Sequence, residues 1–123
     1  MSFEAKKILV IDDEKELCSL LKEFFLGEGY AVECAHDGSE GIVKIQTFNP
    51  DIIILDHRMP VMDGPTMLKQ AKAICSAPVI CISALESKDT PIEYLRLGVK
   101  KFLTKPLDLE ELSQAIVSTL EGK

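Results

Sequence analysis

The sequence lacks an excess of basic residues. Lys and Arg number 14 against 20 Asp and Glu, which gives a formal net charge of −6. Unaided binding of nucleic acid requires a basic face, so direct nucleic-acid binding is not expected. An acidic balance suits a cation site or a basic partner, although a mildly acidic surface more often serves only solubility.

The four cysteines lack the spacing of a metal or redox motif. Cys18, Cys34, Cys75 and Cys81 form no C-x-x-C pair and have no paired histidine nearby in the sequence. Three of them lie inside apolar patterns, where cysteine acts as a small buried hydrophobic residue. A disulfide framework is therefore not expected, and a reducing cytoplasm is the predicted location.

Long apolar runs are also missing. Residues 1–7 contain no apolar core of a secretory signal, and no run approaches the ~20 residues that a membrane span requires. The chain shows no internal repeat, low-complexity tract or linker. At 123 residues it is predicted to form one domain over residues 1–123, long enough to bury a full core.

The sequence alternates short apolar runs with amphipathic segments. The runs predict strands at residues 8–11, 30–35, 52–55, 78–82 and 100–103. The first predicted helix contains residues 17–24 and is closed by Gly27 and Gly29, and the second runs from a capping box at Asp37 and Glu40 to Asn49. The others are predicted at 64–74, from Ser87 or Thr90 to Gly98, and from a cap at Asp108 and Glu111 to Leu120. For the first and third helices the predicted inner faces are Leu17, Leu20, Leu21 and Phe24, and Met67, Leu68, Ala71 and Ile74. This βα unit, repeated five times, predicts a doubly wound α/β fold with a parallel sheet covered on both faces.

Polar residues follow four of the predicted strands. Asp12 and Asp13 end the first strand, Asp56 the third, Ser83 the fourth and Lys105 the fifth. Each alone has an ordinary explanation as a turn residue, a helix cap or a solvated loop residue. In open α/β sheets, however, ligands bind beyond the carboxyl ends of the strands, where the winding reverses. A reversal between the first and third strands brings these side chains to one crevice.

This set of side chains suits metal-assisted phosphoryl transfer. Three neighbouring carboxylates repel one another unless a cation lies among them, and oxygen ligands with room for water favour Mg²⁺. Asp56 can supply the attacking oxygen, while the metal and the Lys105 ammonium hold the equatorial oxygens of the phosphoryl group.

The chain resembles response-regulator receiver domains of the CheY-like superfamily over essentially its whole length. The resemblance rests on four motifs in order: Asp12-Asp13, the segment from Asp56 to Gly64, Ser83-Ala84, and Gly98 through Phe102 to Lys105-Pro106. It implies a flavodoxin-like (βα)5 sheet with strand order 2-1-3-4-5. The implied function is a phosphorylation-activated switch of a two-component system, without turnover of a separate substrate.

The resemblance also implies a role for each matching residue. Asp56 would be the phosphoacceptor. Mg²⁺ would be bound by Asp13 and Asp56, by the backbone carbonyl of Arg58, and by Asp12 mainly through water. Lys105 would pair with Asp56 or its phosphoryl group.

Ser83 and Phe102 would form the switch. Ser83 would hydrogen-bond the phosphoryl group, and Phe102 would turn from exposed to buried as Ser83 moves. The Lys105–Pro106 bond would be cis. Arg58 and Leu85 vary within the family, and the hypothesis is that both tune the lifetime of the phosphorylated state.

Partners are implied only as classes. A sensor histidine kinase or phosphotransfer protein would donate the phosphoryl group, and a downstream protein or an attached output domain would read the change. A homodimer through the fourth helix, fifth strand and fifth helix is possible by analogy. The sequence does not decide between a stand-alone receiver and part of a longer protein.

Three other functions compete with this interpretation. A phosphatase with an Asp nucleophile needs a second Asp two residues later, where this chain has Arg58. A flavin carrier needs a phosphate loop after the first strand, where Asp12, Asp13 and Glu14 would repel phosphate. A phosphorylation-independent adaptor of the same fold stays open. His36 and His57 are interpreted as loop or surface residues.

Overall fold

Five parallel strands form a single sheet in the computed structural model, which describes residues 5–56, 64–83 and 96–122. The strands are β1 (Lys7–Ile11), β2 (Ala31–Ala35), β3 (Ile52–Asp56), β4 (Val79–Ser83) and β5 (Lys101–Thr104). Their order is β2-β1-β3-β4-β5, and every neighbouring pair is parallel. This confirms the predicted doubly wound fold and its strand order.

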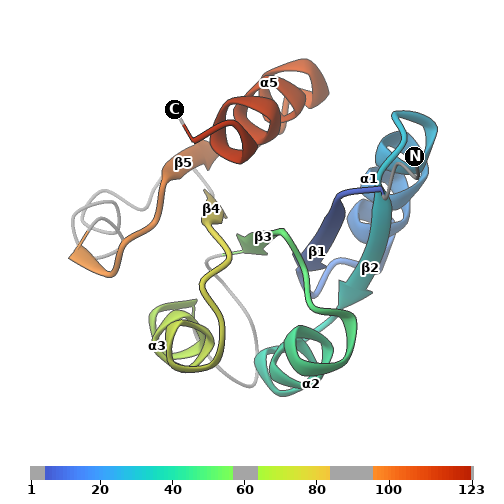
Figure 1. Ribbon diagram of the computed structural model, residues 1–123. Helices are drawn as coiled ribbons and strands as arrows, with labels where there is room; N and C mark the ends of the chain where they lie inside the picture. Colours follow the sequence, from blue (N-terminus) through green and yellow to red (C-terminus); the bar gives the residue numbers. More distant parts are fainter. Residues whose placement is uncertain (1–4, 57–63, 84–95, 123) are drawn as a thin grey trace, which may run out of the picture.

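Helices cover both faces of the sheet. They are α1 (Lys15–Gly27), α2 (Gly38–Phe48), α3 (Gly64–Ile74) and α5 (Leu109–Leu120). In Figure 1, α1 and α5 lie on one side of the sheet and α2 and α3 on the other. Most of the predicted fourth helix lies outside the described residues, so its start stays a prediction. Gly98, its predicted stop, has a φ of 90°, which favours glycine.

The position of β3 in the middle of the sheet explains why residues 52–55 are all apolar. Ile53 and Leu55 pack into the core under α2 and α3, whereas Ile52 and Ile54 pack into the core under α1 and α5. Successive side chains of a strand point to opposite faces, and both faces are covered here, so no position can be polar. Only at its end does β3 change to a carboxylate, Asp56.

Side-chain caps begin two of the helices, as the sequence predicts. The Asp37 carboxylate accepts a hydrogen bond from Glu40 N at 2.8 Å, and Glu40 Oε1 accepts one from His36 N at 2.6 Å. The Asp108 carboxylate accepts from Glu110 N and Glu111 N. These contacts satisfy amide groups that the first turn of a helix leaves without partners.

Two predicted core residues are exposed instead. Leu20 in α1 is 51% exposed and Ile74 at the end of α3 is 42% exposed. The buried face of α1 is centred on Cys18, Leu21 and Phe25. Successive helical residues are turned by about 100°, so a helix with Leu21 facing the sheet turns Leu20 toward the side.

No helix within the described ranges is long and apolar enough to cross a membrane.

Candidate functional site

The carboxyl ends of β1 and β3 bring three acidic side chains together. Ile11 of β1 lies opposite Leu55 of β3, so the next residues, Asp12 and Asp56, reach the same edge of the sheet. One carboxylate oxygen from each of Asp12, Asp13 and Asp56 lies within 4.8 Å of the other two. The parallel register therefore produces the acidic crevice, because strands of the same direction end at the same edge.

Asp12 is the most enclosed of the three carboxylates. Its side chain has no exposed surface. One oxygen, Oδ1, accepts a hydrogen bond from Glu14 N at 2.8 Å, whereas the buried Oδ2 has no hydrogen-bond partner within the described part of the chain. A buried carboxylate oxygen without a donor is costly, and a cation bound in the crevice would compensate that cost.

Burial shifts the protonation of Asp12 strongly. The pKa of Asp12 is raised from 3.8 to about 6; loss of solvation on burial is the largest cause, and the nearby charge of Asp56 acts in the same direction. The hydrogen bond from Glu14 N and the charge of Lys105 oppose this rise without cancelling it. The crevice therefore holds more negative charge than one ammonium group balances, and a proton or a bound metal ion would compensate the excess.

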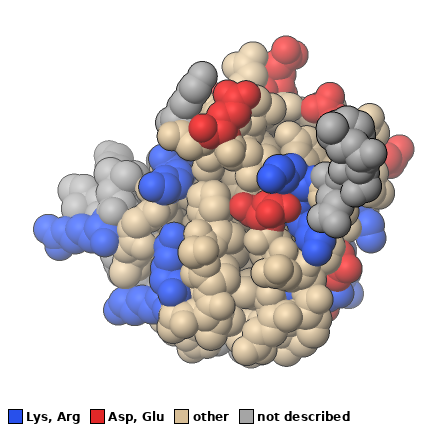
Figure 2. All heavy atoms as spheres, viewed as in Figure 1, with Lys and Arg blue, Asp and Glu red and all other residues tan. Residues whose placement is uncertain are grey.

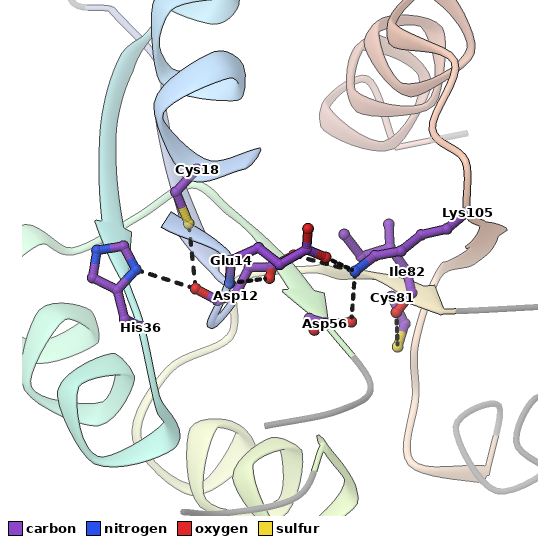
Figure 3. Close-up of polar contacts among 8 residues, drawn as sticks. All are labelled: Asp12, Glu14, Cys18, His36, Asp56, Cys81, Ile82 and Lys105. Atoms are coloured by element: carbon purple, nitrogen blue, oxygen red, sulfur yellow. Dashed lines mark hydrogen bonds and ion pairs between the residues drawn. The ribbon is translucent and has the colours of Figure 1, made fainter. Parts of the chain in front are cut away.

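Lys105 provides the ammonium group of the site. Its Nζ lies 2.8 Å from Glu14 Oε1, 3.5 Å from Asp56 Oδ1 and 3.8 Å from Asp12 Oδ2 (Figure 3). Figure 2 likewise shows acidic and basic atoms side by side near the middle of the face in view. Burial lowers the pKa of Lys105, but its hydrogen bond to Glu14 and the charges of Asp56 and Asp12 outweigh this effect and raise the pKa overall.

The ends of β4 and β5 place Ser83 beside Lys105. Ser83 is almost completely buried and lies opposite Thr104. Lys105 N donates to Ser83 O at 2.7 Å, which continues the pairing of the two strands. The Lys105–Pro106 bond is cis, as the resemblance implies. Phe102 of β5 is half-buried and packs against the core under α2 and α3.

Two predicted site residues cannot be placed. Arg58 lies in the segment 57–63 and Leu85 in the segment 84–95, and both segments are outside the described residues. The carbonyl ligand and the two rate-tuning positions therefore stay predictions.

The structure adds contacts that sequence reasoning missed. Glu14 makes the shortest ion pair of Lys105, from 91 positions away in the sequence. The Asp12 carbonyl oxygen lies 3.3 Å from Cys18 Sγ and 3.2 Å from His36 Nδ1 (Figure 3). The only sequence signal for Glu14 was its place directly after Asp12 and Asp13. Nothing in the sequence indicated Cys18 or His36.

The donor set fits a small hard cation. Asp12, Asp13 and Asp56 offer carboxylate oxygens from two neighbouring strand ends, and no sulfur or imidazole ligand belongs to this group. Such oxygen ligands are those that Mg²⁺ prefers, and a site with few protein ligands leaves room for its bound water.

Comparison with known proteins identifies the family. The family model of the response regulator receiver domain matches residues 8–117, so the chain belongs to that family. The receiver domain of a Francisella response regulator is 37% identical, with a TM-score of 0.85 over 94% of this chain and 97% of that chain. A CheY-like receiver domain protein from Methanospirillum hungatei JF-1 is 27% identical, with a TM-score of 0.91 over 97% and 96%.

A third structure agrees with these two. The N-terminal domain of an uncharacterized protein from Wolinella succinogenes is 34% identical, with a TM-score of 0.86 over 93% of each chain. Receiver domains of this family are phosphoacceptor signalling units of response regulators, not turnover enzymes.

Proposed function

We propose that this chain is a signalling switch in which Asp56 accepts a phosphoryl group from a histidine kinase or phosphotransfer protein. The observation that carries the proposal is the position of Asp56. Its side chain is only 5% exposed, yet it shares a crevice with two other carboxylates and lies 3.5 Å from the Lys105 ammonium. An almost buried nucleophile beside a cation suits transfer to Asp56 in preference to transfer to water.

The chemical step needs few groups. An Asp56 carboxylate oxygen attacks the phosphorus atom, the bond from phosphorus to the donor nitrogen breaks, and the nitrogen leaves with its electron pair. Mg²⁺, held by Asp12, Asp13 and Asp56, would neutralise charge on the phosphoryl oxygens. Lys105 would move from Glu14 and Asp56 to a phosphoryl oxygen, which gives the ammonium a partner that exists only after transfer.

The response would involve the ends of β4 and β5. Ser83 and Lys105 are already linked by a backbone hydrogen bond, so movement of either residue toward the phosphoryl group displaces the other strand end. Phe102, three residues before Lys105, would change its packing with that movement. The surface of the predicted fourth helix, β5 and α5 would then bind a downstream protein, an output domain or a second copy. We place this cycle in the cytoplasm and assign it to one receiver domain over residues 1–123.

Intact-mass spectrometry tests the chemistry. The chain is incubated with acetyl phosphate, with Mg²⁺ or with a chelator, and we expect one phosphoryl adduct that requires the metal. Asp56→Asn should abolish the adduct. Asp51→Asn is the matched control, since Asp51 lies just before β3, at the opposite end of that strand, and accepts from Lys7 N. An adduct that persists in Asp56→Asn would refute the proposal, and a wild-type chain that takes no phosphoryl group would favour the adaptor function.

A further inference from the structure

The strand β2 lies at one edge of the sheet, and its outer side is open. Among the strands that the structure describes, β2 pairs with β1 alone. Ala31 N donates to Lys6 O, so Ala31 directs its backbone groups toward β1. Alternate residues of a strand direct their N–H and C=O groups to opposite sides, so Val32 and Cys34 direct theirs outward. We call these outward groups of Val32 and Cys34 the open edge of β2.

A groove lies along the open edge. A surface pocket of about 620 Å³ is lined by Val32, Glu33 and Cys34 of β2. The rest of its wall comes from α1, from His36 after β2, and from Lys44 of α2. In Figure 1, β2 is the outermost strand on its side of the sheet, with α1 and α2 next to it. The groove therefore presents strand backbone in a hollow, where another extended segment can pair with it.

The wall that α1 contributes to the groove is basic. Lys15, Ser19 and Lys22 line the groove, and their i, i+4, i+7 spacing places them in one stripe along α1. Helical residues form ion pairs with neighbours three or four positions away, and for Lys15 and Lys22 none of these neighbours within α1 is acidic. Within the described ranges, neither lysine has an ion-pair partner elsewhere.

The charge of the groove is opposite to that of the whole chain. The chain carries a net charge of −6, yet the groove is lined by three lysines and by one carboxylate, that of Glu33. Glu33 Oε1 already lies 2.7 Å from Lys44 Nζ, so the ammonium groups of Lys15 and Lys22 exceed the negative charge of the groove. An acidic occupant would supply the complementary charge.

We propose that the open edge of β2 binds an extended acidic segment of a partner protein. The segment would pair as an added strand with the backbone of Val32 and Cys34, and acidic side chains on one of its faces would contact Lys15 and Lys22. The step from Lys15 to Lys22 advances about 10 Å along α1, and side chains on one face of a strand repeat about every 7 Å. Acidic residues at alternate positions of the segment therefore reach both lysines.

A second copy of this chain fits the groove less well. Antiparallel pairing of two β2 strands would place Lys15 and Lys22 of both copies on the same face of the joined sheet, where like charges repel. β2 and β5 lie at opposite edges of the sheet, so a partner on β2 leaves the β5 surface free. The chain would then hold two partners at once, and binding at β2 does not require phosphorylation of Asp56.

The probe for this surface is a synthetic peptide of alternating Glu and Thr with blocked ends. It is titrated into the isotope-labelled chain while the amide signals are followed by NMR. The amide signals of Val32 and Cys34 should shift, and their exchange with solvent deuterium should slow, because these groups gain carbonyl partners.

Two control peptides separate charge from strand pairing. A peptide with Gln in place of Glu keeps the backbone and loses the charge, so it should bind about 3- to 30-fold more weakly, the scale of two exposed ion pairs. A Glu peptide that is N-methylated along its length keeps the charge but loses its amide donors, so it should not slow exchange at Val32 or Cys34. Sedimentation velocity of the chain without peptide reports whether it self-associates.

A pair of lysine variants makes the test specific. Lys22→Gln should weaken binding of the Glu peptide about 1.5- to fivefold, the scale of one exposed ion pair. The control Lys69→Gln, at an exposed position of α3 on the opposite face of the sheet, should not change it.

Four results would count against the proposal. Unchanged β2 amide signals at millimolar Glu peptide would overturn it, even if Asp56 accepts a phosphoryl group normally. Equal affinity for the Gln peptide would overturn the acidic character of the partner. Equal protection of Val32 and Cys34 by the N-methylated peptide would overturn strand pairing. Self-association that protects the same two amides would assign the open edge to a second copy.

Discussion

Replacing Asp12 by asparagine should make the metal-free protein more stable at neutral and alkaline pH. The buried Asp12 carboxylate is ionised there at a cost, because folding raises its pKa from 3.8 to about 6. One pKa unit corresponds to about 1.4 kcal/mol, so a shift of about two units gives roughly 3 kcal/mol. Asparagine removes that cost, keeps an oxygen for Glu14 N and loses the attraction to Lys105. We expect a net gain of about 1–3 kcal/mol in the free energy of unfolding.

The gain should depend on pH in a defined direction. Between 3.8 and about 6, the folded state holds a proton on Asp12 that the unfolded state releases. The penalty from Asp12 is therefore fully present above about pH 6 and disappears as the pH falls toward 4. Urea unfolding of both proteins, in chelator, at pH 8 and at pH 4.5 measures the difference. Mg²⁺ should narrow the difference in stability at pH 8. It stabilises a folded protein that binds it, and the wild type keeps the Asp12 carboxylate as a ligand whereas Asp12→Asn does not.

Asp13→Asn is the matched control for this prediction. Asp13 belongs to the same cluster of carboxylates but is exposed, so its replacement should raise the stability less. A metal-free Asp12→Asn protein that is less stable than the wild type at pH 8 would refute the reasoning. So would a stability difference that stays the same between pH 8 and pH 4.5.

Three further predictions concern other parts of the chain. Glu14→Ala should release Lys105 from its shortest ion pair and speed phosphorylation by acetyl phosphate about 1.5- to fivefold, the scale of one exposed ion pair. The control Glu16→Ala, at an exposed position, should not change the rate. Equal phosphorylation rates for Glu14→Ala and the wild type in a mass-spectrometric time course would contradict this. Leu21→Ala should lower the free energy of unfolding in urea by about 2–5 kcal/mol, and Leu20→Ala should lower it by less than about 0.5 kcal/mol. Similar losses for the two variants would contradict the observed buried face of α1. Asp108→Ala should cost about 0.5–2 kcal/mol through loss of the α5 cap, and an unchanged unfolding midpoint would contradict that role.

The fold and most of the site could be predicted from local patterns. The βα units follow from signals between neighbours in the sequence. These are the apolar runs, the amphipathic segments between them, and cap residues such as Asp37 and Asp108. Because the sheet is parallel and the winding reverses, the positions of Asp12 and Asp56 at strand ends also determined that they would meet. The predicted inner faces of α1 and α3 were wrong only at Leu20 and Ile74, where several apolar residues competed for one face.

Only the tertiary structure decided which contacts these side chains make. The long side chain of Glu14 turns toward Lys105 because the β1 and β5 ends share one edge, and no pattern within the sequence carries that information. The same is true of Cys34, whose Sγ lies 3.5 Å from the Cys18 carbonyl oxygen because α1 packs against β2. Periodicity determines which elements form and which face is buried, whereas contacts between distant residues depend on how the elements pack.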